Sequence, residues 1–131
     1  MKRTITLAAS LFLCGIALLL SPAQVVASGG CPVSAHEASQ ILGYAVDLKN
    51  LGTMGCNYVG QHGLATVMVN VFPSAADATR RVQQVRARAA SAPRRAALAF
   101  GNHGATFVQV IVQPNDKRAA DALLNAVLGK L

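Results

Sequence analysis

Residues 1–27 have the pattern of an export signal, and this sets the compartment in which the rest of the chain folds. Lys2 and Arg3 give a basic start, an apolar run covers residues 5–20, and Val25-Val26-Ala27 forms a small-residue cleavage site. We expect cleavage after Ala27. The mature chain, residues 28–131, would then be a single secreted or periplasmic domain near the small end of what folds unaided.

Two other uses of the N-terminal segment stay open. A permanent membrane anchor needs about 20 apolar residues, and Ser21-Pro22 interrupts the run early. Lipid modification of Cys31 is the second, because Gly30 is the small residue that such processing needs, although Ser28 stands where an aliphatic residue is usual. We therefore expect no transmembrane segment in the mature chain, with a lipoprotein anchored at Cys31 as the alternative.

The mature chain keeps an even number of cysteines. Cys14 leaves with the signal, so Cys31 and Cys56 remain as one pair in an oxidising compartment. We expect them to form a disulfide, for which the chain-entropy argument gives roughly 3.5 kcal/mol. A structural metal is not expected, because neither cysteine belongs to the closely spaced pair that zinc sites use.

The charge of the chain is strongly basic. The formal net charge of +7 falls to +5 when Lys2 and Arg3 are removed with the signal, since ten basic residues then face five acidic ones. Outside the cytoplasm this favours anionic lipid head groups and envelope polymers as partners. Nucleic acid is not expected, because the chain has no Trp and few aromatic side chains for base stacking.

Periodicity and capping signals predict an α+β domain. Ser34 and Glu37 form a capping box before a helix over 35–42, which ends at Gly43. The further expected elements are strands at 44–48, 56–59 and 65–71, a helix near 75–90, strands at 96–100 and 105–112, and a last helix after Asn115 or Asp116. The order α-β-β-β-α-β-β-α indicates a two-layer sandwich, with an antiparallel sheet covered by helices on one face.

Two stretches of the chain are similar to each other. Gly60-Gln61-His62-Gly63 and Gly101-Asn102-His103-Gly104 are each followed by Ala-Thr, an apolar strand, a proline and a helix. This predicts an internal ββα duplication, against the alternative of two ordinary hairpins that are alike by chance. If each helix folds back on the preceding strand, His62 and His103 lie at opposite ends of the sheet, so no two-histidine metal site is expected.

No set of residues indicates catalysis or a cofactor. The mature cysteines are expected to be oxidised, and no Gly-x-Ser-x-Gly elbow is present. Of the five mature acidic residues, Glu37, Asp77 and Asp116 fall in helix first turns, where the helix dipole explains them. We therefore expect a protein that is not an enzyme and that has no catalytic residue, cofactor site or metal site.

The remaining signal is a set of arginines on and after the middle helix. Arg86 flanks the apolar stripe of that helix, where its stem can lie along the surface. The candidate anion-docking residues are Arg80, Arg81, Arg88, Arg94 and Arg95. Arginine suits phosphate and carboxylate groups, but the simpler explanation of the same residues is a solvated helix face that keeps a basic protein in solution.

Several features resemble a family of small secreted domains of unknown function. They are Cys31-Pro32 before a helix ending in Leu42-Gly43, Cys56-x-Tyr58, the alternating strand 66–71 and the Ser-Ala-Ala-Asp-Ala helix start. Such domains occur in actinobacterial envelope lipoproteins and are similar to the extracellular sensor domain of a mycobacterial serine/threonine kinase. The resemblance covers most of residues 31–112, but the chain lacks a clear lipidation box and has a short hairpin after Pro93. It implies a disulfide-stapled envelope domain with no catalytic residues to carry over.

Two functions therefore stand as hypotheses. The first is a non-catalytic envelope module that binds or senses an unknown protein or small ligand through the sheet face or the loops. The second is an adhesive protein that binds anionic envelope polymer or lipid head groups through the arginine-rich helix. Salt separates them, because binding through exposed charges weakens as ionic strength rises.

Overall fold

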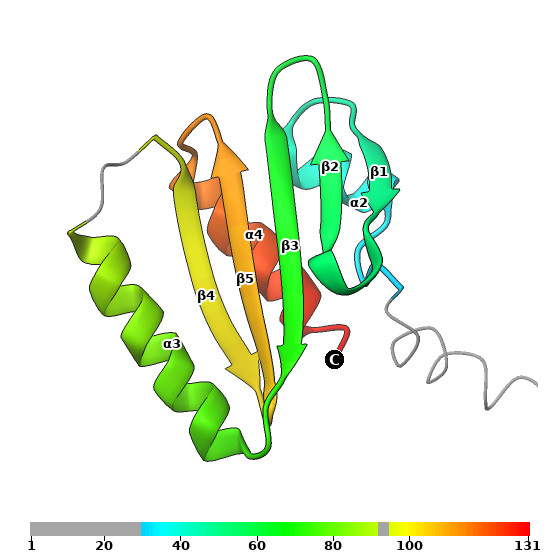
Figure 1. The fold of residues 1–131 in the computed structure, drawn as a ribbon. Helices are drawn as coiled ribbons and strands as arrows, with labels where there is room; N and C mark the ends of the chain where they lie inside the picture. Colours follow the sequence, from blue (N-terminus) through cyan, green and yellow to red (C-terminus); the bar gives the residue numbers. More distant parts are fainter. Residues whose placement is uncertain (1–29, 92–94) are drawn as a thin grey trace, which may run out of the picture. The chain divides into compact units, whose positions relative to one another are not determined.

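Strand β5 (Thr106–Gln113) joins two antiparallel hairpins into one sheet. On one side it pairs with β3 (Leu64–Val71), which continues through β2 (Cys56–Val59) to β1 (Asp47–Asn50); on the other it pairs with β4 (Ala97–His103). The computed structural model describes residues 30–91 and 95–131, and within these ranges the strand order is β1-β2-β3-β5-β4 (Figure 1). The strands β1 and β4 are therefore the edges of the sheet.

The helices start where their capping signals predict. They are α2 (Ala35–Leu42), α3 (Ala75–Ala90) and α4 (Lys117–Leu128), and their N-cap residues are Ser34, Ser74 and Asp116. In each case the cap side chain accepts a hydrogen bond from a backbone N–H of the first turn, at 3.0–3.1 Å. Helix α2 ends as expected at Gly43, whose φ of 84° suits a residue without a Cβ.

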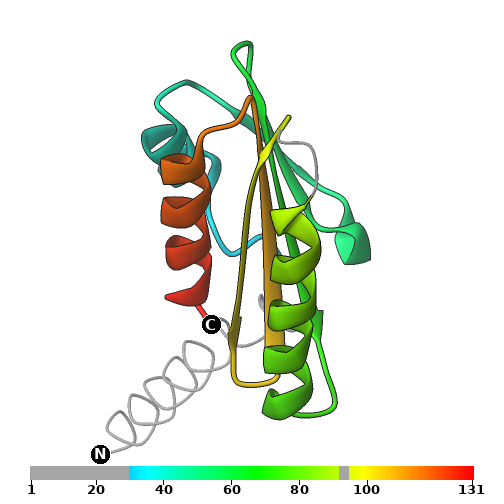
Figure 2. The same ribbon diagram turned by 90° about the vertical axis from the view of Figure 1, so that its left-hand side faces the viewer.

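The predicted α+β class and element order are confirmed. The coverage of the sheet, however, differs from the expected two-layer arrangement. Helix α3 lies on one face of the sheet, whereas α2 and α4 lie on the other (Figure 2). The ββα duplication stays a prediction.

The handedness of one connection explains where α3 lies. Strands β3 and β4 run in the same direction with β5 between them, so α3 is the crossover between two parallel strands. The crossover is right-handed (Figures 1 and 2), as nearly all such connections are. This rule places α3 on one face, and the opposite face is left to α2 and α4.

The sequence of β4 agrees with helices on both faces of the sheet. Ala97 and Ala99 belong to the larger core, together with side chains of α2 and α4, whereas Leu98 and Phe100 pack in a second core against α3. Successive side chains of a strand point to opposite faces, and here both sets are apolar. A strand segment whose side chains are apolar on both sides is buried on both faces, so a sheet covered on one face only was the wrong expectation.

Two strand boundaries differ clearly from the prediction. The strand expected at 96–100 is β4, which continues to His103. The strand expected at 44–48 is β1 at Asp47–Asn50, which pairs with β2 in the register Asp47↔Val59. The N–H of Val46 donates instead to Oγ of Ser39 on α2, at 3.1 Å. The segment before Asp47 is thus tied to a helix, and the strand starts later.

Some of the expected features fall outside the described residues. These are the signal at 1–27, with its cleavage site, and part of the chain break around Pro93. Residues Cys31–Leu131 form one compact unit. None of the described helices is both long and apolar enough to cross a membrane.

Candidate functional site

The predicted disulfide is confirmed. Cys31 lies just before α2 and is bonded to Cys56 at the start of β2, with 5.9 Å between their Cα atoms. The bond fastens the segment that leads into α2 to the sheet. Both sulfurs are therefore committed to structure, and neither is a free thiol.

The structure does not gather the candidate arginines into one cluster. Arg81 and Arg88 lie on the same face of α3, about 10 Å apart along its axis, while Arg80 is turned by about 100° from Arg81. Nη1 of Arg80 lies 3.2 Å from Oδ1 of Asp77; the side chain of Arg80 is largely exposed and that of Asp77 is about one-third exposed. Arg95 is exposed before β4, and Arg94 lies outside the described residues.

Arg81, Arg88 and Arg95 form no ion pair with any other described residue. Their charge is thus open to an external anion. Arg81 and Arg88 share one face of α3, whereas Arg95 follows the helix. None of the described pockets is lined by these three side chains, so they are separate cations rather than a chelating site.

The turn histidines lie at opposite ends of the sheet, as predicted. His62 is in the turn that leads into β3, near the pair Leu64↔Gln113, whereas His103 ends β4 beside the pair Val71↔Thr106. The length of β3 separates the two turns, which is about 25 Å. Within residues 30–91 and 95–131, no group of three or more His, Cys, Asp or Glu residues is placed to hold a metal ion.

A hollow at the His62 end of the sheet escaped the sequence reasoning. It has a volume of about 750 Å³ and lies between the segment that follows α2 and the turn between β2 and β3. Its lining residues are Gly43, Tyr44, Ala45, Val46, Asp47, Val59, Gly60, Gln61 and His62. The ring of His62 meets the ring of Tyr44 edge to face, with 5.8 Å between the centroids and 66° between the planes.

Two glycines of the turn leave the space that Tyr44 occupies. A Cβ on Gly60 would lie 2.8 Å from Cδ2 of Tyr44, and a Cβ on Gly63 would lie 2.5 Å from its hydroxyl oxygen. The hydroxyl is buried and has no hydrogen-bond partner among the described residues. Burial raises the pKa of Tyr44, and the negative charge of Asp116 acts in the same direction.

The Gly60-Gln61-His62-Gly63 pattern was the only sequence signal for this hollow. The pattern indicated a turn and nothing more, because no local rule shows that a tyrosine sixteen or more positions upstream would pack against it. The hollow combines an exposed imidazole, the amide of Gln61, the carboxylate of Asp47 and the ring of Tyr44. These groups can hydrogen-bond a polar ligand and cover its apolar side.

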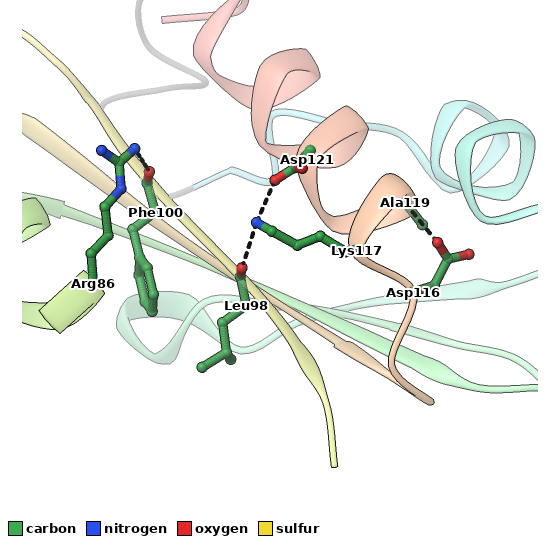
Figure 3. A network of polar contacts seen from close by, with 7 residues as sticks. All are labelled: Arg86, Leu98, Phe100, Asp116, Lys117, Ala119 and Asp121. Atoms are coloured by element: carbon green, nitrogen blue, oxygen red, sulfur yellow. Dashed lines mark hydrogen bonds and ion pairs between the residues drawn. The ribbon is translucent and has the colours of Figure 1, made fainter. Parts of the chain in front are cut away.

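A second feature that the sequence did not reveal lies at the edge strand β4 (Figure 3). Arg86 of α3 donates through Nη2 to the carbonyl of Phe100 at 2.8 Å. Lys117 of α4 donates through Nζ to the carbonyl of Leu98 at 3.0 Å, and the same nitrogen lies 2.7 Å from the carboxylate of Asp121. Arg86 is thus bound to the sheet rather than lying along the helix surface alone.

Comparison of the chain with models of known protein families finds no match, and a comparison with curated proteins finds none either. The resemblance to secreted envelope domains stays a prediction.

Proposed function

We propose that the chain is an exported, non-catalytic module of the cell envelope that binds a protein or small ligand in the hollow beside Tyr44 and His62. The observation that carries this proposal is the hollow itself. Its volume of about 750 Å³ falls within the range of roughly 300–1,000 Å³ that small-molecule sites occupy. The disulfide supports an extracytoplasmic location, because such bonds persist in oxidising compartments.

The chemistry of the hollow favours a neutral or weakly polar ligand. Asp47 is acidic and none of the described lining residues is Lys or Arg, so the hollow lacks the excess of positive charge that an anionic ligand would select. Carbohydrate or peptide fragments of the cell wall fit this description, since they combine hydroxyl and amide groups with apolar faces.

The hollow is tested with soluble muropeptides released from peptidoglycan, titrated into ¹⁵N-labelled mature protein. Amide shifts are expected at residues 43–47 and 59–62, and His62→Ala should remove them. The matched control is His103→Ala, which changes the equivalent histidine at the other end of the sheet and should leave the shifts in place. Shifts that instead fall along α3, or no shifts at all, would remove the hollow from consideration for this class of ligand.

The arginines on and after α3 support a second candidate function, adhesion to anionic envelope polymer or lipid head groups. The supporting observation is that Arg81, Arg88 and Arg95 are without ion pairs among the described residues, while the one pair of Arg80 is exposed. Mature protein is mixed with vesicles of phosphatidylglycerol, and the variant Arg80→Gln/Arg81→Gln/Arg88→Gln is compared with Lys49→Gln/Arg118→Gln/Lys130→Gln, which removes the same charge from other elements.

Adhesion through α3 predicts that only the arginine variant loses binding. It also predicts that the parent loses binding as salt rises from about 0.05 to about 0.5 M, over which the screening length falls several-fold. Equal losses in the two variants would mean that net charge alone attracts the vesicles, and the docking role of α3 would be dropped. Binding that changes neither with salt nor in the arginine variant would contradict adhesion through α3 and would favour the hollow as the binding site.

A further inference from the structure

The outward edge of β4 has backbone groups that are not paired with another described strand. Two of its carbonyls accept hydrogen bonds from side chains instead. Leu98 and Phe100 are alternate residues of an edge strand, and their carbonyls accept from Lys117 and Arg86 rather than from another strand. In an antiparallel ladder the N–H and C=O of one residue point to the same side. The N–H groups of Leu98 and Phe100 therefore also point away from β5, in the spacing that an added strand would use.

The two side chains that cover this edge come from opposite faces of the sheet. Arg86 reaches it from α3 and Lys117 reaches it from α4 (Figure 3). Both are exposed, with 63% of the Lys117 side chain accessible. The contact of Lys117 is exposed and that of Arg86 is partly buried, and an incoming backbone N–H can compete with each of them for its carbonyl.

A groove runs along the same edge. It has a volume of about 230 Å³, and its lining residues are Arg86, Ala89, Leu98, Ala99, Phe100, Lys117, Asp121 and Leu124. This is smaller than the roughly 300–1,000 Å³ of typical small-molecule sites, but its walls of Ala89 and Leu124 come from the two helices and leave apolar surface on both sides of the strand. A groove of this shape accommodates side chains of an extended segment.

The charge of the β4 edge indicates which kind of peptide segment would bind there. The edge holds two cations against one acid, and Lys117 already binds the carboxylate of that acid, Asp121, at 2.7 Å. Alternate side chains of an added strand point to opposite faces, so acidic side chains would meet Arg86 on one face or Lys117 on the other. A second copy of this basic chain, paired through its own β4, would bring four cations together and is disfavoured.

We propose that the β4 edge is a docking site for an extended acidic peptide segment, which adds to the sheet as a further strand and takes Arg86 and Lys117 as partners for its carboxylates. This mode combines backbone hydrogen bonds for affinity with side-chain contacts for specificity. The site lies on different elements from the hollow beside Tyr44, so it stands whether or not that hollow binds a ligand.

The probe is a fluorescein-labelled peptide of roughly eight residues in a Glu-Glu-Val-Val repeat, a normal strand length, which places Glu on both faces of an added strand; it is added to mature, oxidised protein. Binding should slow amide hydrogen exchange at Leu98 and Phe100 in the parent. The variant Arg86→Gln/Lys117→Gln keeps donors for the two carbonyls but removes both charges, and it should bind about tenfold more weakly or worse, as the loss of two charge-assisted hydrogen bonds requires.

Two controls separate strand addition from general attraction. Arg80→Gln/Lys130→Gln removes the same charge from two cations that are ion-paired elsewhere, and it should bind like the parent. A peptide in which Pro replaces each Val has the same charge but cannot pair as a strand, and it should not protect the two amides.

Three results would overturn the proposal. The first is equal weakening by both charge variants, and the second is equal binding of the Glu-Val and Glu-Pro peptides. The third is a parent that binds no peptide while Arg86→Gln/Lys117→Gln self-associates in analytical ultracentrifugation. That result would show that the two cations only shield the edge against pairing with other chains.

Discussion

The hydroxyl of Tyr58 donates a hydrogen bond of 2.7 Å to the backbone carbonyl of Val33, and both residues are fully buried. Val33 follows Cys31 by two positions, and Tyr58 follows Cys56 by two. The hydrogen bond and the disulfide therefore join the same two segments, each across a separation of 25 residues. Together they hold the segment that precedes α2 against β2.

Tyr58→Phe is expected to lower the free energy of unfolding by about 1–2 kcal/mol, because the buried carbonyl of Val33 loses this donor. The shape of the ring is kept, so packing should not change. Urea unfolding at neutral pH measures the difference. A change close to zero would mean that the carbonyl finds another donor when the hydroxyl is absent.

Alkaline pH should weaken the fold through the same residue. Burial raises the pKa of Tyr58 to about 12, and the negative charge of Glu37 adds to the effect. Because the folded pKa lies above the unfolded value of about 10, the contribution is complete below pH 10 and is lost as pH rises toward 12. We expect a loss on the order of 2 kcal/mol over that window in urea titrations, and a smaller loss in Tyr58→Phe. Equal losses in the two proteins would assign the alkaline sensitivity to other groups.

Tyr44→Phe should behave in the opposite way. The hydroxyl of Tyr44 is buried and finds no partner among the described residues, so its removal relieves a desolvation cost that is typically about 1–3 kcal/mol. We expect the free energy of unfolding to stay the same or to rise by about 1 kcal/mol. A clear loss of stability would show that the hydroxyl has a structural partner.

Cys31→Ser/Cys56→Ser should lower the free energy of unfolding by roughly 2–5 kcal/mol, since the unfolded chain is no longer restrained. Urea unfolding of the parent with and without reductant gives an independent measure of the same quantity. Two free thiols titrating in the folded, exported parent would contradict the bonded pair, and an unchanged midpoint would show that the bond adds nothing to stability.

Export is tested by the intact mass of the protein recovered outside the cytoplasm. Cleavage after Ala27 predicts a chain that begins at Ser28. A mass that corresponds to a chain starting at Met1 would contradict processing. A mass that corresponds to a diacylated Cys31 would replace simple cleavage with lipid anchoring.

Local signals were sufficient where a structure depends on neighbouring residues. The capping box of Ser34 and Glu37 and the stop at Gly43 gave the bounds of α2 correctly, because caps satisfy backbone groups within one turn. The cysteine pair was found by counting. The strand before Asp47 was misplaced, because Ser39 on α2 holds the N–H of Val46 and no local pattern reports that contact.

The repeated glycines also show what local sequence reveals and what it does not. Gly60 and Gly63 leave room for the side chain of Tyr44. Gly104, which matches Gly63 in the sequence, instead adopts a positive φ of 57°, and Gly63 does not. The sequence makes these positions look equivalent. Their contacts differ because each turn meets different elements of the folded chain.

By itself, the amino-acid sequence determined the elements of this protein, their order, the α+β class and the disulfide partners, since these follow from periodicity, capping and cysteine count. Only the tertiary structure decided that α3 lies opposite α2 and α4, that Tyr44 lines a hollow with His62, and that Arg86 and Lys117 meet at the β4 edge. The physical reason is separation along the sequence, because those contacts join residues that are far apart in the chain. The right-handed crossover and the packing of whole elements bring them together.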